Sequence, residues 1–119
     1  MSRILIIDDN VANREILRFR LERLGHVVLE AEDGNAGVSE ALTTKPDLIF
    51  MDVMMPQKDG WQACRELKND PRSKAAPIVM LTALDQSPDA LRRDCGADAY
   101  MPKPWTVAEL GDILSRWLP

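Results

Sequence analysis

Three runs of consecutive apolar residues constrain the fold of this chain more than any other feature. The runs cover residues 4–7, 48–51 and 78–81. Strands in which apolar and polar residues do not alternate are typically buried on both faces, as in a parallel sheet with helices on either side. Two weaker apolar stretches, residues 27–29 and 97–101, are typical of strands at the edges of such a sheet. The pattern therefore predicts three central strands and two edge strands.

Capping signals between the strands predict several of the helices. They are Asp59 with Gln62, Thr106 with Glu109, and Ser87 followed by Pro88, with Gly96 as the stop of that helix. The first two pairs place a capping side chain three residues before a Gln or Glu, which is the arrangement of a capping box. Proline is favoured at the first helical position because its missing N–H has no partner there in any case. We therefore expect helices to begin near these three positions.

Two helices are expected in the first half of the chain. Leu17, Leu21 and Leu24 are expected on one buried face of the first helix, which ends at Gly25. Residues 33–44 are expected to form the second, although the two glycines in this range disfavour a helix. Strand and helix then alternate five times. This order predicts an α/β fold with a doubly wound five-stranded parallel sheet, which binds ligands at the carboxyl ends of its strands.

Length and composition exclude several classes of protein. With 119 residues, the chain is expected to form one domain over residues 1–119. Its net charge of −4 argues against direct nucleic-acid binding, and no apolar stretch reaches the roughly 20 residues of a membrane span. The N-terminus lacks the layout of a secretory signal. Cys64 and Cys95 cannot form a disulfide framework, which favours a cytoplasmic protein.

Acidic, hydroxyl and basic side chains follow the ends of the predicted strands. They are Asp8 and Asp9 after the first strand, Asp52 after the third, Thr82 after the fourth and Lys103 shortly after the fifth. If these strands are neighbours, the side chains converge in one shallow pocket. Three close carboxylates repel one another unless a cation neutralises them, and oxygen ligands favour a hard cation such as Mg²⁺. An ammonium and a hydroxyl beside a carboxylate also suit phosphoryl transfer, in which an aspartate can be the nucleophile.

These residues lie in four motifs that resemble the receiver domain of two-component response regulators. The motifs are residues 6–10 (Ile-Ile-Asp-Asp-Asn), 51–60 (Met-Asp-Val-Met-Met-Pro-Gln-Lys-Asp-Gly), 81–83 (Leu-Thr-Ala) and 96–104 (Gly-Ala-Asp-Ala-Tyr-Met-Pro-Lys-Pro). The resemblance covers essentially the whole chain and is to the single-domain, chemotaxis-regulator-like form. It implies a flavodoxin-like sheet in the order 2-1-3-4-5 and a cis peptide bond between Lys103 and Pro104.

The resemblance also implies a role for each residue of the pocket. Asp52 is the expected phosphoacceptor, taking a phosphoryl group from phosphohistidine on a histidine kinase or histidine phosphotransfer protein. Asp9, Asp52 and the backbone carbonyl of Met54 are the expected direct ligands of Mg²⁺, with Asp8 acting through a bound water. Thr82 is expected to donate a hydrogen bond to the phosphoryl group, and Lys103 to form an ion pair with it.

Switching is a further implication of the resemblance. Phosphorylation is expected to pull the Thr82 hydroxyl inward and to let the Tyr100 ring occupy the vacated space. This change biases the face formed by the fourth helix, fifth strand and fifth helix, through which a downstream protein target is bound. The chain is thus expected to be a phosphoprotein in a phosphorelay, and not an enzyme acting on other substrates.

Two further features bear on partners and on kinetics. Ile16 and Phe19 of the first helix are candidates for a docking surface beside the pocket, although partial burial explains Ile16 almost as well.

Met54 and Leu84 lie two residues beyond Asp52 and Thr82, and neither side chain can orient a hydrolytic water. The sequence therefore predicts a persistent phosphoryl group.

Other functions remain open on the sequence alone. A haloacid-dehalogenase-like phosphatase also uses an aspartyl nucleophile and Mg²⁺, but it requires a second acid where this chain has Met54. An unphosphorylated pseudo-receiver is the other alternative, although such chains typically lack one of the site residues present here. Residues 117–119 end the last predicted helix, so we expect either a single-domain regulator or a receiver domain taken from a longer protein.

Overall fold

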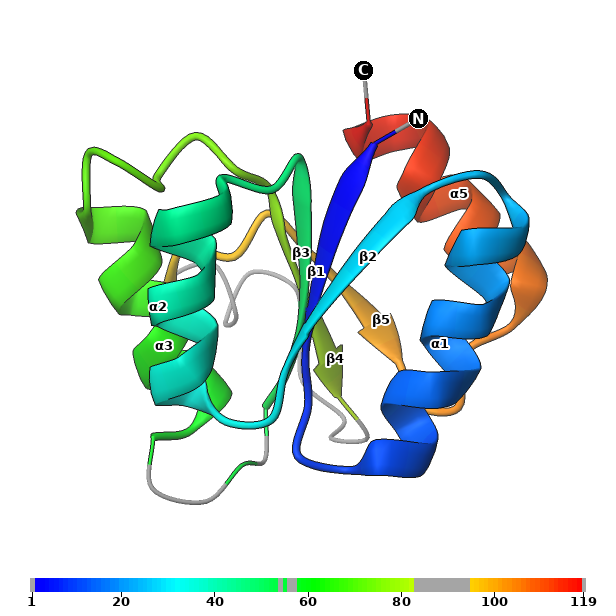
Figure 1. Cartoon of the computed structure of the whole chain (residues 1–119), viewed down its shortest axis with the longest axis horizontal. Helices are drawn as coiled ribbons and strands as arrows, with labels where there is room; N and C mark the ends of the chain where they lie inside the picture. The colour runs from blue at the N-terminus through cyan, green and yellow to red at the C-terminus, as the bar shows by residue number, and fades with distance from the viewer. Residues whose placement is uncertain (1, 54, 56–57, 83–94, 119) are drawn as a thin grey trace.

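A parallel sheet forms the centre of the computed structural model, which describes residues 2–53, 55, 58–82 and 95–118 (Figure 1). Over these residues the sheet contains five strands in the order β2-β1-β3-β4-β5. The strands are β1 (Arg3–Ile7), β2 (Val27–Ala31), β3 (Leu48–Asp52), β4 (Ile78–Thr82) and β5 (Ala99–Pro102). The predicted strand order and the two predicted edge strands are confirmed.

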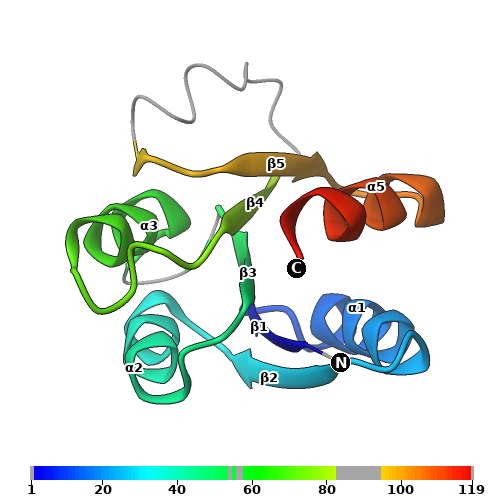
Figure 2. The same cartoon turned by 90° about the horizontal axis from the view of Figure 1, so that it is seen from above.

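Helices cover both faces of the sheet (Figure 2). They are α1 (Val11–Arg23), α2 (Gly34–Thr44), α3 (Gly60–Asn69) and α5 (Val107–Trp117). In Figure 2, α1 and α5 lie on one side of the sheet and α2 and α3 on the other. The helix predicted to begin at Ser87 falls mainly on residues 83–94, which lie outside the described residues.

The three central strands bury side chains on both faces. In β1, Ile4 and Ile6 pack with α1 and α5, whereas Leu5 and Ile7 pack on the side of α2 and α3. Side chains of β3 and β4 divide between the same two cores, and all residues of these two strands are buried. The unbroken apolar runs of the sequence therefore reflect alternation between two cores instead of alternation between core and solvent.

The predicted caps are present at the helices within the described part of the chain. Asp59 accepts a hydrogen bond from the Gln62 N–H at the start of α3. Thr106 and Glu109 form both bonds of a capping box at the start of α5. Side-chain caps of this kind satisfy backbone donors that have no partner within the helix.

One prediction for α1 is wrong. Leu17 and Leu21 are buried, but Leu24 is 55% exposed. The helix ends at Arg23 and Leu24 is its C-cap residue, so the buried face does not extend to Leu24.

Gly37 lies inside α2 although glycine disfavours a helix. A Cβ added at this position would come within 2.5 Å of the Ile7 side chain, so the close packing of α2 on β1 leaves room only for glycine.

Within the described ranges, none of the helices is long and apolar enough to cross a membrane.

Candidate functional site

The carboxyl ends of β1, β3 and β4 place the predicted site residues side by side. Ile7 of β1 pairs with Met51 of β3, so Asp8 and Asp52 each lie one residue beyond this pair. Thr82 is the last residue of β4, directly beside the pair formed by Asp52 and Leu81. The order β1-β3-β4 thus brings together residues that are 74 positions apart in the sequence, Asp8 being at one end and Thr82 at the other.

Three carboxylates form an acidic cluster at this edge of the sheet. Asp8, Asp9 and Asp52 each offer an oxygen atom, and these oxygens all lie within 4.8 Å of one another. Asp8 and Asp52 are buried, whereas Asp9 is exposed to solvent. The cluster is therefore open to solvent on one side and enclosed by protein on the other.

Burial makes the charge on Asp8 unfavourable. Desolvation is the main cause that raises the pKa of Asp8, from the ordinary 3.8 to about 6, and the negative charge of Asp52 adds to it. The Asn10 N–H, which donates to Asp8 Oδ1 at 2.9 Å, lowers the pKa but only partly offsets burial. A cation bound among these oxygens removes the repulsion between them.

Lys103 supplies a positive charge beside Asp52. Its Nζ lies 2.7 Å from Asp52 Oδ1, forming a hydrogen-bonded ion pair. The Lys103 backbone N–H donates to the Thr82 carbonyl oxygen at 3.1 Å, which fixes the loop after β5 against the end of β4. The peptide bond between Lys103 and Pro104 is cis, as the resemblance implied.

Gly60 is a site residue for which sequence reasoning had given no role. Its N–H donates to the Val53 carbonyl oxygen at 2.9 Å. A Cβ added at Gly60 would come within 2.2 Å of the Asp52 carbonyl oxygen. Only glycine lets α3 begin this close to the end of β3. The signal was available in the sequence, because Gly60 directly follows the Asp59 cap in the longest of the four motifs.

Of three other residues named in the predictions, the structure describes Tyr100 but not Met54 or Leu84. Tyr100 is half-buried and packs against the core on the side of α2 and α3. Met54, with its predicted metal-binding carbonyl, and Leu84 lie outside the described residues, as does most of the fourth helix of the predicted switching face.

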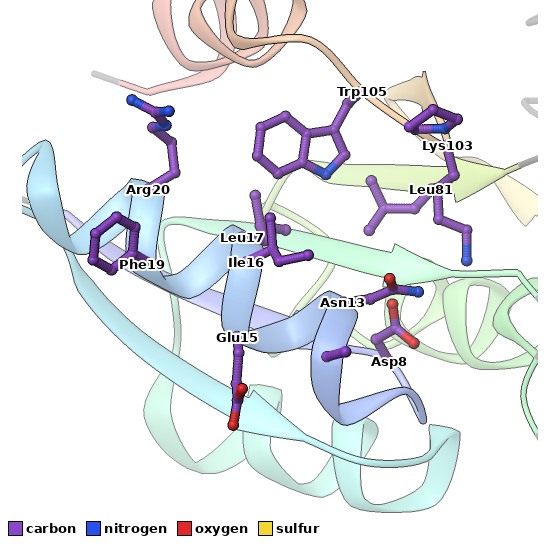
Figure 3. Close-up of a pocket in the computed structure, with 12 residues that line it drawn as sticks. Asp8, Asn13, Glu15, Ile16, Leu17, Phe19, Arg20, Leu81, Lys103 and Trp105 are labelled. Atoms are coloured by element: carbon purple, nitrogen blue, oxygen red, sulfur yellow. The ribbon is translucent and has the colours of Figure 1, made fainter.

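A groove of about 920 Å³ runs from the acidic cluster along α1 (Figure 3). Asp8 and Lys103 lie at one end of it, and Phe19 and Arg20 lie toward the other. Trp105 faces Ile16 and Leu17 across the groove in Figure 3. Ile16 and Phe19 are each 60% exposed, so two large apolar side chains of α1 remain uncovered beside the site.

The donor set of the cluster fits a hard divalent cation. All the ligand atoms it offers are carboxylate oxygens, which suit Mg²⁺ and offer no preference for softer metals. The open side at Asp9 leaves room for the waters that Mg²⁺ usually retains.

Comparison with known proteins identifies the family of this chain. The sequence matches the family model of the response regulator receiver domain over residues 4–115. The chain belongs to this family. Receiver domains are signalling domains of two-component systems and not classical enzymes; they bind Mg²⁺ at an acidic pocket, are phosphorylated by histidine kinases and act on downstream targets.

Two relatives differ in how much of their length this chain covers. The chain is 43% identical over 111 residues to the DNA-binding dual master transcriptional regulator RpaA of Synechocystis, an alignment that covers 92% of this chain and 46% of RpaA. The receiver chain thus spans about half the length of that relative. It is 42% identical over 105 residues to protein PilH of Pseudomonas aeruginosa, covering 87% of each chain.

A solved receiver domain shows the metal in a similar fold. The receiver domain of the sensor histidine kinase PA1611 of Pseudomonas aeruginosa has a magnesium ion coordinated in its active-site cleft. It superimposes on this chain with a TM-score of 0.87 and 35% identity, covering 98% of this chain and 96% of the other.

Proposed function

We propose that this receiver domain accepts a phosphoryl group on Asp52 from phosphohistidine of a histidine kinase or histidine phosphotransfer protein. The observation that carries the proposal is the position of the Asp52 carboxylate. It is the one predicted site carboxylate that belongs to the acidic cluster and also forms an ion pair with Lys103, at 2.7 Å. Asp52 thus belongs to the proposed Mg²⁺ site and also contacts the positive charge of Lys103.

The transfer itself needs little beyond positioning and charge. An Asp52 carboxylate oxygen attacks phosphorus, the P–N bond of phosphohistidine breaks, and the imidazole nitrogen keeps the electron pair and takes a proton. Lys103 then forms an ion pair with the phosphoryl oxygens, and the Thr82 hydroxyl donates a hydrogen bond to one of them. Such stabilisation of charge on the transferred group accounts for most of the catalysis in phosphoryl transfer.

The acidic cluster is the proposed Mg²⁺ site. Asp9, Asp52 and the Met54 carbonyl would hold the metal directly, and Asp8 would act through a bound water. When bound, Mg²⁺ neutralises the negative charge that accumulates when a phosphoryl group approaches three carboxylates. The pKa of Asp8 is raised mainly by burial and further by the charge of Asp52, so a bound cation would stabilise the ionised carboxylate.

The switch is proposed to run from Thr82 to Tyr100. These residues belong to the neighbouring strands β4 and β5, where Met80 pairs with Tyr100 and Thr82 with Pro102. Movement of the Thr82 hydroxyl toward a phosphoryl group would open space for the half-buried Tyr100 ring and alter the face that binds the downstream target.

Crystal structures of the free protein and of its complex with Mg²⁺ and a phosphoryl mimic test the proposed switch. An unchanged Tyr100 rotamer would contradict it.

The groove along α1 is the proposed docking surface for the phosphodonor protein. It joins the acidic cluster, and its uncovered side chains Ile16 and Phe19 are apolar. An apolar helix face of the donor would cover them while its phosphohistidine reaches Asp52.

We extend the proposal to residues 1–119 as one receiver domain that works in the cytoplasm. The family match covers residues 4–115, and Leu118 still packs against the core on the side of α1 and α5. The buried free thiols of Cys64 and Cys95 suit a reducing compartment.

The proposal is tested by intact mass after incubation with Mg²⁺ and a small phosphodonor such as acetyl phosphate. The unaltered protein is expected to gain the mass of one phosphoryl group, and Asp52→Asn to gain none. A phosphatase would consume the donor without retaining the group, and a pseudo-receiver would neither retain the group nor consume the donor. Either result would contradict the proposal.

A further inference from the structure

Arg14 contacts the acidic loop from outside the cluster. It lies in the first turn of α1, and its side chain is 14% exposed. Its Nη1 donates to the Asp8 carbonyl oxygen at 2.6 Å. This carbonyl belongs to the peptide group that joins Asp8 to Asp9, so the guanidinium is bonded to the link between two of the three clustered carboxylates.

Glu30 of β2 holds Arg14 in this orientation. Arg14 Nε lies 3.3 Å from Glu30 Oε1, and Arg18 Nη1 lies 2.8 Å from Glu30 Oε2. One carboxylate therefore receives two guanidinium groups from successive turns of α1, next to the edge strand β2 (Figure 2). The Asp8 N–H also donates to the Ala31 carbonyl oxygen at 3.1 Å, so β2 fixes this loop through both backbone and side chain.

The position of Arg14 in its helix is electrostatically unfavourable. The N-terminus of a helix carries partial positive charge and favours acidic residues in the first turn, but α1 has none there. A basic residue in this turn is offset here by the Glu30 carboxylate and by the Asp8 carbonyl. The planar guanidinium of Arg14 directs one N–H donor to the Glu30 carboxylate and another to the Asp8 carbonyl. A lysine ammonium cannot reproduce this pair of directed donors.

We propose that Arg14 is a positioning residue of the Mg²⁺ site, which orients the Asp8–Asp9 peptide so that the carboxylates converge before the metal arrives. The inference rests on the proposed function. A peptide group is planar, so fixing its carbonyl oxygen also fixes the direction in which the backbone of Asp9 leaves. The Asn10 N–H fixes Asp8 Oδ1 from the other side, at 2.9 Å.

Loss of Arg14 would leave the carboxylates free to relieve their repulsion by moving apart. Binding of Mg²⁺ would then have to reassemble the loop, and the metal affinity would fall. Arg14 would act through the peptide group next to the proposed ligand Asp9. Residues that orient metal ligands by hydrogen bonds typically change metal affinity by about 10- to 100-fold when they are replaced.

Titration calorimetry with Mg²⁺ tests the inference on Arg14→Met, with Arg18→Met as the matched control. Both variants remove one arginine from Glu30, but only the first removes the donor to the Asp8 carbonyl. We expect a Kd for Mg²⁺ about tenfold higher or more in Arg14→Met, and within about twofold of the unaltered protein in Arg18→Met. Arg14→Lys is expected to recover part of the affinity.

Glu30→Gln keeps the inference testable if Arg14→Met does not fold, because it retains the shape of the side chain and weakens its hold on Arg14. It is expected to raise the Kd for Mg²⁺ in the same direction. If Arg14→Met, or Glu30→Gln where Arg14→Met does not fold, binds Mg²⁺ as tightly as the unaltered protein, the Arg14 contact only holds α1 and β2 together and the inference is wrong.

The inference and the proposed function fail in different ways. A shifted Kd in Arg14→Met, together with an unaltered protein that retains no phosphoryl group on Asp52, would refute the function and support the positioning role. Normal phosphorylation of the unaltered protein, together with an unshifted Kd for Mg²⁺ in Arg14→Met, would support the proposed function and refute the positioning role of Arg14.

Discussion

The buried Asp8 carboxylate is expected to lower the stability of the metal-free protein at neutral pH. Asp8 is 1% exposed, and burial raises the pKa of its carboxyl group to about 6. In the unfolded chain the pKa is near 3.8, so the folded protein binds more protons than the unfolded one between these two values. Stability must then fall as pH rises through this range, and the loss is present in full at neutral pH.

Asp8→Asn is therefore expected to stabilise the metal-free protein. The amide keeps an oxygen for the Asn10 N–H but carries no charge. At pH 7.5 in EDTA we expect the free energy of unfolding to rise by roughly 1–3 kcal/mol, from a shift of about two pKa units. At pH 4 the difference should largely disappear, because Asp8 is then protonated. Urea denaturation at both pH values measures this, and a variant less stable at pH 7.5 would contradict it.

We also predict that single residues set the lifetime of the phosphoryl group on Asp52. Met54 and Leu84 offer no polar group to orient a hydrolytic water. We expect the phosphoryl group on Asp52 to persist well beyond seconds after the donor is removed. Intact mass followed over time checks the decay, with Met54→Gln expected to accelerate it. Loss of the group from the unaltered protein within seconds would refute the prediction.

At the scale of elements, the close approach of α3 to β3 determines where Asp52 lies. The first residue of α3, Gly60, is bonded to the Val53 carbonyl and leaves no space for a side chain next to Asp52. The helix start and the strand end thus form one unit, and the carboxylate projects from it into the site.

Gly60→Ala is expected to damage both stability and metal binding. The added methyl group would meet backbone atoms, which cannot rotate away, so we expect a loss of about 1–3 kcal/mol in the free energy of unfolding and a weaker affinity for Mg²⁺. Gly111→Ala is the matched control, because a Cβ at this position in α5 meets nothing within 4 Å. It should stabilise the protein by about 0.5–1 kcal/mol. Equal effects of the two changes on unfolding and on Mg²⁺ would contradict the account.

Much of the element level could be predicted from the sequence. The apolar runs predicted the central strands because a strand that is buried on both faces has an unbroken run of apolar residues. Thr106 and Asp59 predicted helix starts because a cap depends only on residues next to it in the sequence. The exposure of Leu24 could not be predicted, since it depends on the residue at which α1 ends. The bond from Arg14 to the Asp8 carbonyl depends on β2 supplying Glu30, a contact that no local pattern shows.

At the scale of the whole molecule, the proposed phosphoryl chemistry and the proposed docking surface lie at the same edge of the sheet. The acidic cluster lies at the carboxyl ends of the central strands, and the groove continues from it along α1 (Figure 3). A small phosphodonor needs only the cluster, whereas a protein donor also has to cover Ile16 and Phe19. The two requirements can therefore be separated by the choice of donor.

Ile16→Asp is expected to slow transfer from a phosphorylated histidine phosphotransfer protein by about tenfold, while acetyl phosphate labels the variant at the normal rate. A charge at the centre of an apolar contact opposes docking but lies outside the phosphoryl chemistry. Leu24→Asp is the control, because Leu24 is similarly exposed on the same segment and does not line the groove. If Ile16→Asp transfers at the unaltered rate from the protein donor, the groove is not the docking surface.

The central claim is that Asp52 alone receives the phosphoryl group. Aspartyl phosphate is reduced by borohydride to homoserine, so mass mapping of peptides after reduction identifies the labelled residue. After incubation with Mg²⁺ and acetyl phosphate, we predict homoserine at position 52 and retention of Asp8 and Asp9 as aspartate, with no conversion in EDTA. Conversion at position 8 or 9, or at none of the three positions, would contradict the account.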